Sequence, residues 1–162
     1  MMTHDLLRGV RVFEGVADDH LEALAAIAEV KEFPANAVVF REGEMTPFIY
    51  AVLDGRVGLE VRVVGRGNAR IHTVGAGELL GWSPLLQLGP MTATARALTA
   101  CRLIALRAPQ VLALGERSPK FGAELMRRTA VALAQRLNAT RLHLLDVFRT
   151  EMPVSPPGEG QA

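Results

Sequence analysis

Short apolar strands separated by turns are the feature that most constrains how this chain can fold. From Val57 to Val63 every second residue is apolar, which is typical of a strand with one buried face. Asp54-Gly55, just before it, has the sequence of a hairpin turn. Further strands are predicted at residues 38–40, 48–53, 70–74 and 101–106. Because no helical pattern interrupts residues 38–74, we predict an antiparallel β-roll or jelly-roll barrel covering about residues 32–107.

Helical patterns lie on both sides of these strands. In residues 6–30, Leu21 and Leu24 recur at helical spacing, and Asp19 with Glu22 has the spacing of a capping box. A long helix begins at Ser118-Pro119 and runs to residue 148. The predicted fold class is therefore mainly β with flanking helices (α+β), in one domain over residues 1–148. Residues 149–162 are rich in proline and glycine and are predicted to be a disordered tail.

The long helix carries a heptad pattern with alternating spacings of four and three residues. A single helix cannot bury such a seam and also pack its other apolar side without a partner, so we predict a homodimer that pairs through this helix. A helix lying on its own roll is the alternative. The seam consists of Met126, Ala130, Leu133, Leu137, Thr140, Leu144 and Val147.

Charge and cysteine content limit the partners. The net charge of +1 over 162 residues provides no strong field for nucleic acid or a membrane surface. A single cysteine, Cys101, excludes an internal disulfide and fits a reducing compartment, and no signal peptide or membrane span is apparent. We expect a cytoplasmic protein. The fourteen residues after the long helix are too few for a helix-turn-helix, so no direct DNA binding is expected.

The stretch Gly75–Ala97 has the composition of a tight bend followed by a helix start and a new strand. Its glycines permit positive φ, Ser83-Pro84 offers the start of a short helix, and Gly89-Pro90 ends it. A one-turn helix between two strands leaves backbone N–H groups free to meet an anion. A bend that only turns a sheet corner is the alternative.

This stretch resembles the phosphate-binding cassette of the cyclic nucleotide-binding domain family, the effector domain of Crp/Fnr-type regulators. The resemblance lies in Gly77-Glu78-Leu79 and in Thr92-Ala93 followed by Arg96-Ala97. Pro34 to Glu44 and Ile49 to Val57 resemble the roll signatures of the same family.

The resemblance implies a ligand site in which Glu78 accepts a hydrogen bond from a ribose hydroxyl. Met91 stands where the family has its phosphate-binding arginine, so binding in the usual cAMP mode is not expected. The implied ligand-binding residues are Gly77, Glu78, Leu79, Leu80, Met91, Thr92 and Ala93. Further contacts are expected from Trp82, Arg96, Gln135, Arg136 and Thr140.

The function these features predict is a non-enzymatic effector-sensing domain that dimerises through its long helix. Its effector would be a cyclic nucleotide or another small anion, with no tightly held cofactor or metal, and its downstream partner is left open. The alternative is a ligand-free dimerisation or scaffold module of the same fold. A cupin-type metalloenzyme of similar shape would need several converging histidines, and only His72 lies on a predicted roll strand.

Overall fold

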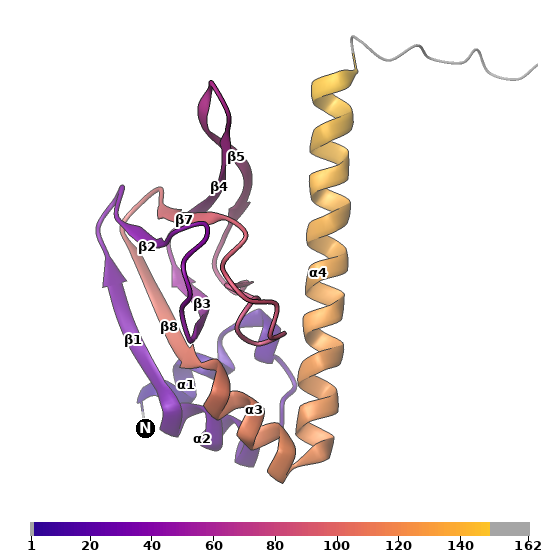
Figure 1. Ribbon diagram of the computed structural model, residues 1–162. Helices are drawn as coiled ribbons and strands as arrows, with labels where there is room; N and C mark the ends of the chain where they lie inside the picture. The colour runs from indigo at the N-terminus through magenta and orange to yellow at the C-terminus, as the bar shows by residue number, and fades with distance from the viewer. Residues whose placement is uncertain (1, 150–162) are drawn as a thin grey trace, which may run out of the picture.

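The computed structural model describes residues 2–149, in which two four-stranded sheets form a roll flanked by helices (Figure 1). The sheet orders are β1-β8-β3-β6 and β2-β7-β4-β5, and every pairing is antiparallel. The predicted fold class is confirmed. The elements are α1 (Met2–Arg8), η1 (Arg11–Phe13, a 3-10 helix), α2 (Asp18–Ile27), β1 (Ala28–Phe33), β2 (Val38–Phe40), β3 (Phe48–Asp54), β4 (Val57–Val63), β5 (Gly67–Val74), β6 (Leu79–Leu80), β7 (Thr94–Ala97), β8 (Cys101–Arg107), α3 (Ala108–Arg117) and α4 (Pro119–Phe148).

The first sheet is buried on both faces, and β3 shows how. Tyr50 and Val52 pack between the two sheets, whereas Ile49 and Ala51 pack against the helices. This double burial explains why β3 reads as a continuous apolar run instead of an alternating one. The helix-side core joins residues of α1, α2, α3 and α4 to this sheet, so the helices are fixed to the roll by apolar packing.

The prediction that Asp54-Gly55 forms the turn of a β-hairpin is wrong. The turn exists, but β3 and β4 do not pair, because β3 lies in the first sheet and β4 in the second. Gly55 has φ +92°, and a Cβ at this position would collide with the carbonyl oxygen of Ala100. The turn therefore carries the chain from one sheet to the other. The paired hairpin is β4–β5, whose turn lies at Val64–Arg66.

The N-terminal region also differs from the sequence prediction. Residues 6–30 form parts of α1, η1, α2 and β1 in succession. The capping box predicted for Asp19 and Glu22 is wrong, because the N-cap residue of α2 is Ala17, which makes no side-chain hydrogen bond. Asp19 Oδ1 instead accepts a hydrogen bond from the backbone N–H of its neighbour His20, at 3.0 Å.

At the C-terminal side, α4 covers the predicted range, and α3 is a helix that the sequence prediction missed. α4 runs along one side of the roll (Figure 1), and residues 141–149 are all exposed. Except for Arg149, the predicted tail 149–162 lies outside the described residues. No helix within residues 2–149 is long and apolar enough to cross a bilayer.

Candidate functional site

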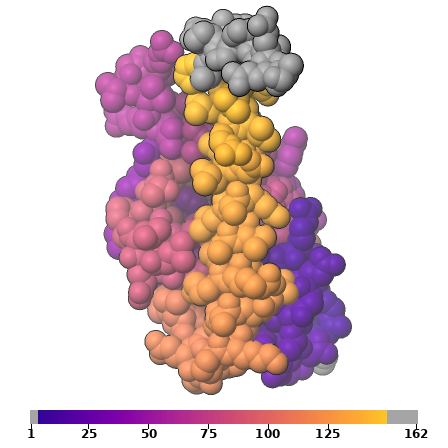
Figure 2. All heavy atoms as spheres, turned by 90° about the vertical axis from the view of Figure 1, so that its right-hand side faces the viewer, coloured from indigo at the N-terminus to yellow at the C-terminus, as the bar shows by residue number. Residues whose placement is uncertain are grey.

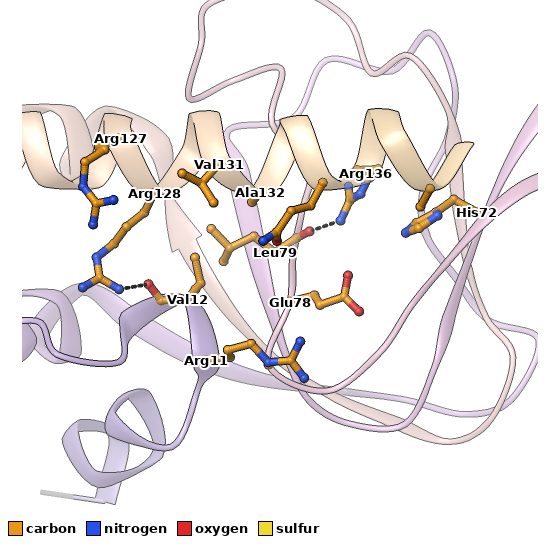
Figure 3. A pocket seen from close by; sticks show the side chains of 13 residues that line it. Arg11, Val12, His72, Glu78, Leu79, Arg127, Arg128, Val131, Ala132 and Arg136 are labelled. Carbon is orange, nitrogen blue, oxygen red and sulfur yellow. Dashed lines mark hydrogen bonds between the residues drawn. The ribbon is translucent and has the colours of Figure 1, made fainter. Parts of the chain in front are cut away.

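A cavity of about 480 Å³ lies between α4 and the part of the roll where β6 begins (Figure 3). One wall is α4, and the other is made by η1, by β5 and by the backbone leading into β6. The cavity is lined by Arg11, Val12, His72, Gly77, Glu78, Leu79, Arg127, Arg128, Val131, Ala132, Gln135, Arg136 and Ala139.

The wall at Gly77 and Glu78 is held by backbone hydrogen bonds. The Gly77 N–H donates to the Val52 carbonyl oxygen at 2.9 Å, and the Val12 N–H donates to the Gly77 carbonyl oxygen at 3.3 Å. Gly77 has φ +87°, and a Cβ there would lie 3.0 Å from Cβ of Arg11. Glycine at position 77 therefore allows η1 to approach the roll closely. The Glu78 carboxylate accepts a hydrogen bond from the Gly75 N–H at 3.3 Å.

Arg136 closes one end of the cavity from α4. Its Nη2 donates to the carbonyl oxygen of Leu79 at 2.6 Å, and its guanidinium carbon lies 5.8 Å from the centre of the Trp82 ring. Among the described residues, Arg136 Nε and Trp82 Nε1 are buried without a hydrogen-bond partner. Burial lowers the pKa of Arg136, and the carboxylate of Glu78 opposes that shift. A buried cation with an unused donor is costly unless an anion meets it, so this end favours a negatively charged group.

The other end of the cavity contains Arg127 and Arg128. Arg128 donates from Nη1 to the Val12 carbonyl oxygen at 2.9 Å and from Nε to Glu124 at 2.8 Å. Arg127 donates to the same carboxylate at 2.9 Å. The hydrogen bond from Arg127 is the main reason that the pKa of Glu124 falls to about 2. Arg128 thus ties α4 to η1, which in turn contacts Gly77.

His72 enters the cavity from β5. Burial lowers the pKa of His72, the positive charge of Arg136 lowers it further, and Glu78 opposes both. The neutral imidazole is therefore favoured at neutral pH, and His72 adds no charge to the site there.

The cavity brings together some of the site residues expected from the sequence and leaves out others. Leu80, Met91 and Ala93 belong to the core between the sheets, and Thr92 is exposed. Trp82 packs on the helix-side core beside Arg136. The expected residues that line the cavity are Gly77, Glu78, Leu79, Gln135 and Arg136.

Two other expected contacts, Arg96 and Thr140, do not line the cavity. Arg96 lies on β7, where its Nε is 3.3 Å from Glu60 and its Nη1 donates to the Asn36 carbonyl oxygen at 3.0 Å. Thr140 donates to the Arg136 carbonyl oxygen at 2.9 Å, within α4.

Several cavity residues were missed from the sequence. Arg127 and Arg128 were not among the expected contacts, yet both line the cavity together with Arg136. A helical spacing signal was present, since Arg128, Ala132, Arg136 and Ala139 recur every three or four residues. Arg11 carries no such signal, because it reaches the cavity only through the long-range contact of η1 with Gly77.

The opposite side of α4 is open, as Figure 2 shows along the length of the helix. The exposed fraction is 71% for Leu137, 54% for Leu144 and 59% for Val147. Leu137 and Leu144 project away from the cavity, because they lie about 180° and 160° around the helix from Arg128. An apolar stripe of this kind is suited to pairing with another helix.

Comparison with known proteins shows which domains this chain is similar to. Residues 30–118 match the family model described as the cyclic nucleotide-binding domain. A relative in Mycobacterium tuberculosis, named a CRP-like cAMP-activated global transcriptional regulator, is 25% identical over 149 residues, which cover 92% of this chain and 65% of the relative. The cyclic AMP receptor protein of Thermus thermophilus is 29% identical over 138 residues, which cover 85% of this chain and 62% of that protein. The chain thus spans just under two thirds of the length of these relatives.

Solved structures agree on the fold. The catabolite activator protein of Thermus thermophilus superposes with a TM-score of 0.68 at 28% identity, covering 86% of this chain and 63% of that one. A cyclic nucleotide-binding domain from Methylobacillus flagellatus superposes with a TM-score of 0.75 at 17% identity, covering 96% of this chain and 85% of that one, a likeness of fold alone.

Proposed function

The chain belongs to the cyclic nucleotide-binding domain family, and we propose that it is a non-enzymatic, cytoplasmic sensor of a small anionic effector. The effector enters the cavity beneath α4 and contacts Arg136 and Gln135 on that helix and Glu78 on the roll. The names of the two bacterial relatives, a cAMP-activated regulator and a cyclic AMP receptor protein, support a regulatory role. Near-neutral charge supports the further proposal that this chain does not bind DNA by itself.

The observation that carries this proposal is the state of Arg136. Its guanidinium is removed from water, uses the Leu79 carbonyl as an acceptor, and leaves Nε without a partner among the described residues. An anionic ligand would supply the missing acceptor and the opposite charge. Because the ligand is anionic and the Leu79 carbonyl is neutral, the guanidinium gains an opposite charge as well as a hydrogen bond when the ligand replaces the carbonyl.

The effector would act through the position of α4. Since Arg136 joins α4 to Leu79 and Arg128 joins it to Val12, a ligand that draws Arg136 away from Leu79 loosens one of two polar attachments. The helix then shifts its population between two positions relative to the roll. We propose that a second protomer pairs along the seam of α4 and that this dimer transmits the shift to a partner.

A ligand-free scaffold of the same fold is the second candidate, and Met91 favours it. The Met91 side chain is 4% exposed and fills the core between the sheets, so the position where the family's phosphate arginine is expected is occupied by packing. In this alternative the contact of Arg136 with Leu79 is only structural.

A thermal-shift screen separates the two candidates. The panel contains cAMP, cGMP and common anionic metabolites, and the proteins are the wild type and Arg136→Gln. If the chain is a sensor, at least one ligand should raise the Tm of the wild type, and the Arg136→Gln variant should lose most of that rise. A flat wild-type response across the panel supports the scaffold.

A further inference from the structure

We infer that the effector of this cavity carries two separated anionic groups, one for each end, and that it is a nucleotide with two phosphate groups. The inference rests on the proposed function, because it assumes that the cavity binds a small effector. It concerns the class of ligand, which the resemblance to single-phosphate cyclic nucleotides does not supply.

The positive groups stand at two ends of the cavity. Figure 3 shows Arg127 and Arg128 at one end and Arg136 at the other, all projecting from α4. Arg128 and Arg136 are eight residues apart, which corresponds to roughly 12 Å along a helix. Arg11 and Glu78 lie on the facing wall. With the guanidinium groups at opposite ends, a ligand with two separated phosphates matches them better than a single phosphate does.

The charges around the cavity are unbalanced. Four guanidinium groups line it, those of Arg11, Arg127, Arg128 and Arg136. Two carboxylates face them, Glu78 in the wall and Glu124, which Arg127 and Arg128 share. Among the described residues at the cavity, the positive charges thus exceed the negative charges by two. A ligand with one negative charge would neutralise only half of this excess.

The donors at each end are not all in use. At one end, Arg136 has its buried Nε without a partner. At the other, Nη1 of Arg127 and Nη2 of Arg128 donate no hydrogen bond within residues 2–149, although the other nitrogens of both side chains do. Each end therefore offers donors to a phosphate without first breaking an ion pair.

The middle of the cavity is suited to an uncharged body. Val12, Leu79, Val131 and Ala132 line it between the charged ends, with the Gln135 amide beside them. A volume of about 480 Å³ is within the usual range of small-molecule sites, roughly 300–1,000 Å³. A base or sugar between two phosphates matches this order of charged, apolar and charged surfaces.

Isothermal titration calorimetry on the full chain tests the inference. The probes with two phosphate groups are adenosine 3′,5′-bisphosphate and cyclic di-AMP, and the probe with one is cAMP, all at the same salt concentration. We expect at least one two-phosphate probe to bind about tenfold or more tighter than cAMP.

Variants locate the two ends. Arg127→Gln should weaken the two-phosphate probe about tenfold and change cAMP affinity less than about twofold, whereas Arg136→Gln should weaken both. Arg66→Gln is the matched control, because it removes one exposed positive charge at the β4–β5 turn. Each variant is first checked for an unchanged unfolding transition.

Two other outcomes overturn the inference, and they differ. If cAMP binds as tightly as both two-phosphate probes and Arg127→Gln affects all three equally, the sensor stands and the two-anion ligand is rejected. If none of the probes binds and the thermal-shift panel is also flat, the proposed function fails together with the inference.

Discussion

Nη2 of Arg136 lies 2.6 Å from the carbonyl oxygen of Leu79, so a charged side chain of α4 is attached to the backbone of β6, at the edge of the first sheet. Leu79 and Arg136 are 57 residues apart in sequence. Because this contact lies between the long helix and the stretch Gly75–Ala97, the function proposed above makes ligand binding and helix position depend on the same guanidinium.

The second attachment of α4, through Arg128, should contribute measurably to stability. Arg128 has a side-chain exposure of 17% and bonds both Glu124 and the Val12 carbonyl. Arg128→Ala should therefore lower the free energy of unfolding by about 1–3 kcal/mol. The matched variant is Arg127→Ala, whose side chain is 63% exposed and bonds only Glu124 among the described residues, and its effect should be small. Equal losses in urea unfolding of the two variants would show that Arg128 does not brace α4.

The seam of α4 should control the oligomeric state. Leu133→Glu combined with Leu137→Glu places two charges in the proposed helix pair, and their desolvation should leave monomers at about 10 µM. Light scattering measures the mass. Leu142→Glu is the control, because Leu142 is 55% exposed but lies about 140° around the helix from Leu137. A double variant that keeps the mass of a dimer, or a wild type that is already monomeric, contradicts pairing along this seam.

Stability should fall as the pH drops below the ordinary histidine pKa, about 6.5, in part because of His72. The pKa of His72 is lowered in the folded state by burial and by Arg136, so the unfolded chain takes up a proton first. The stabilising contribution is complete above about pH 6.5 and is lost progressively as the pH falls toward the lowered pKa. Arg70 and His143 lie beside His72 and share this environment.

The measurement is Tm at about pH 7.5 and pH 5.5 for the wild type and His72→Gln. The variant should lose less Tm than the wild type between these values, because glutamine takes up no proton. An identical decrease in both proteins would assign the pH dependence to other groups.

Met91→Arg tests whether the interior of the roll can still accept a cyclic phosphate. Met91 is buried among Phe40, Tyr50 and their neighbours, so an arginine should lower the Tm of the ligand-free protein. If the site resembles that of the family, the arginine adds hydrogen bonds of roughly 1.5–3 kcal/mol each to a phosphate, and cAMP affinity should rise by at least about tenfold. Met91→Leu is the size-matched control. Calorimetry that finds no gain over this control indicates a closed interior.

The sequence predicts the elements of this fold better than their pairing. The long helix and a strand at residues 48–53, which corresponds to β3, were predicted because their apolar patterns are local. The passage of the chain from one sheet to the other at Gly55 was not predicted. The same two turn residues can connect either two paired strands or two strands of different sheets. Which strands pair is decided by long-range packing, on which a turn sequence has no bearing.

The same limit applies to the site. Gly77, Glu78 and Arg136 could be proposed from the resemblance and from the position of the helix. The contribution of Arg11 could not, because it depends on how closely η1 approaches Gly77. The direction of Arg128 depends likewise on the crossing of α4 over η1, which the spacing of residues along α4 does not determine.

Trp82 provides the most direct test of the central claim, that an anion binds beneath α4 by engaging Arg136. It is the single tryptophan in the sequence and its ring lies beside the Arg136 guanidinium, so its fluorescence reports on this contact. Titration with cAMP and cyclic di-AMP should give a saturable change in Trp82 emission with at least one of them. In Arg136→Gln the midpoint should move to about tenfold higher ligand concentration or beyond, and in Arg66→Gln it should stay within about twofold. A saturable change that Arg136→Gln leaves at the same midpoint, or no change with either nucleotide, would contradict the account.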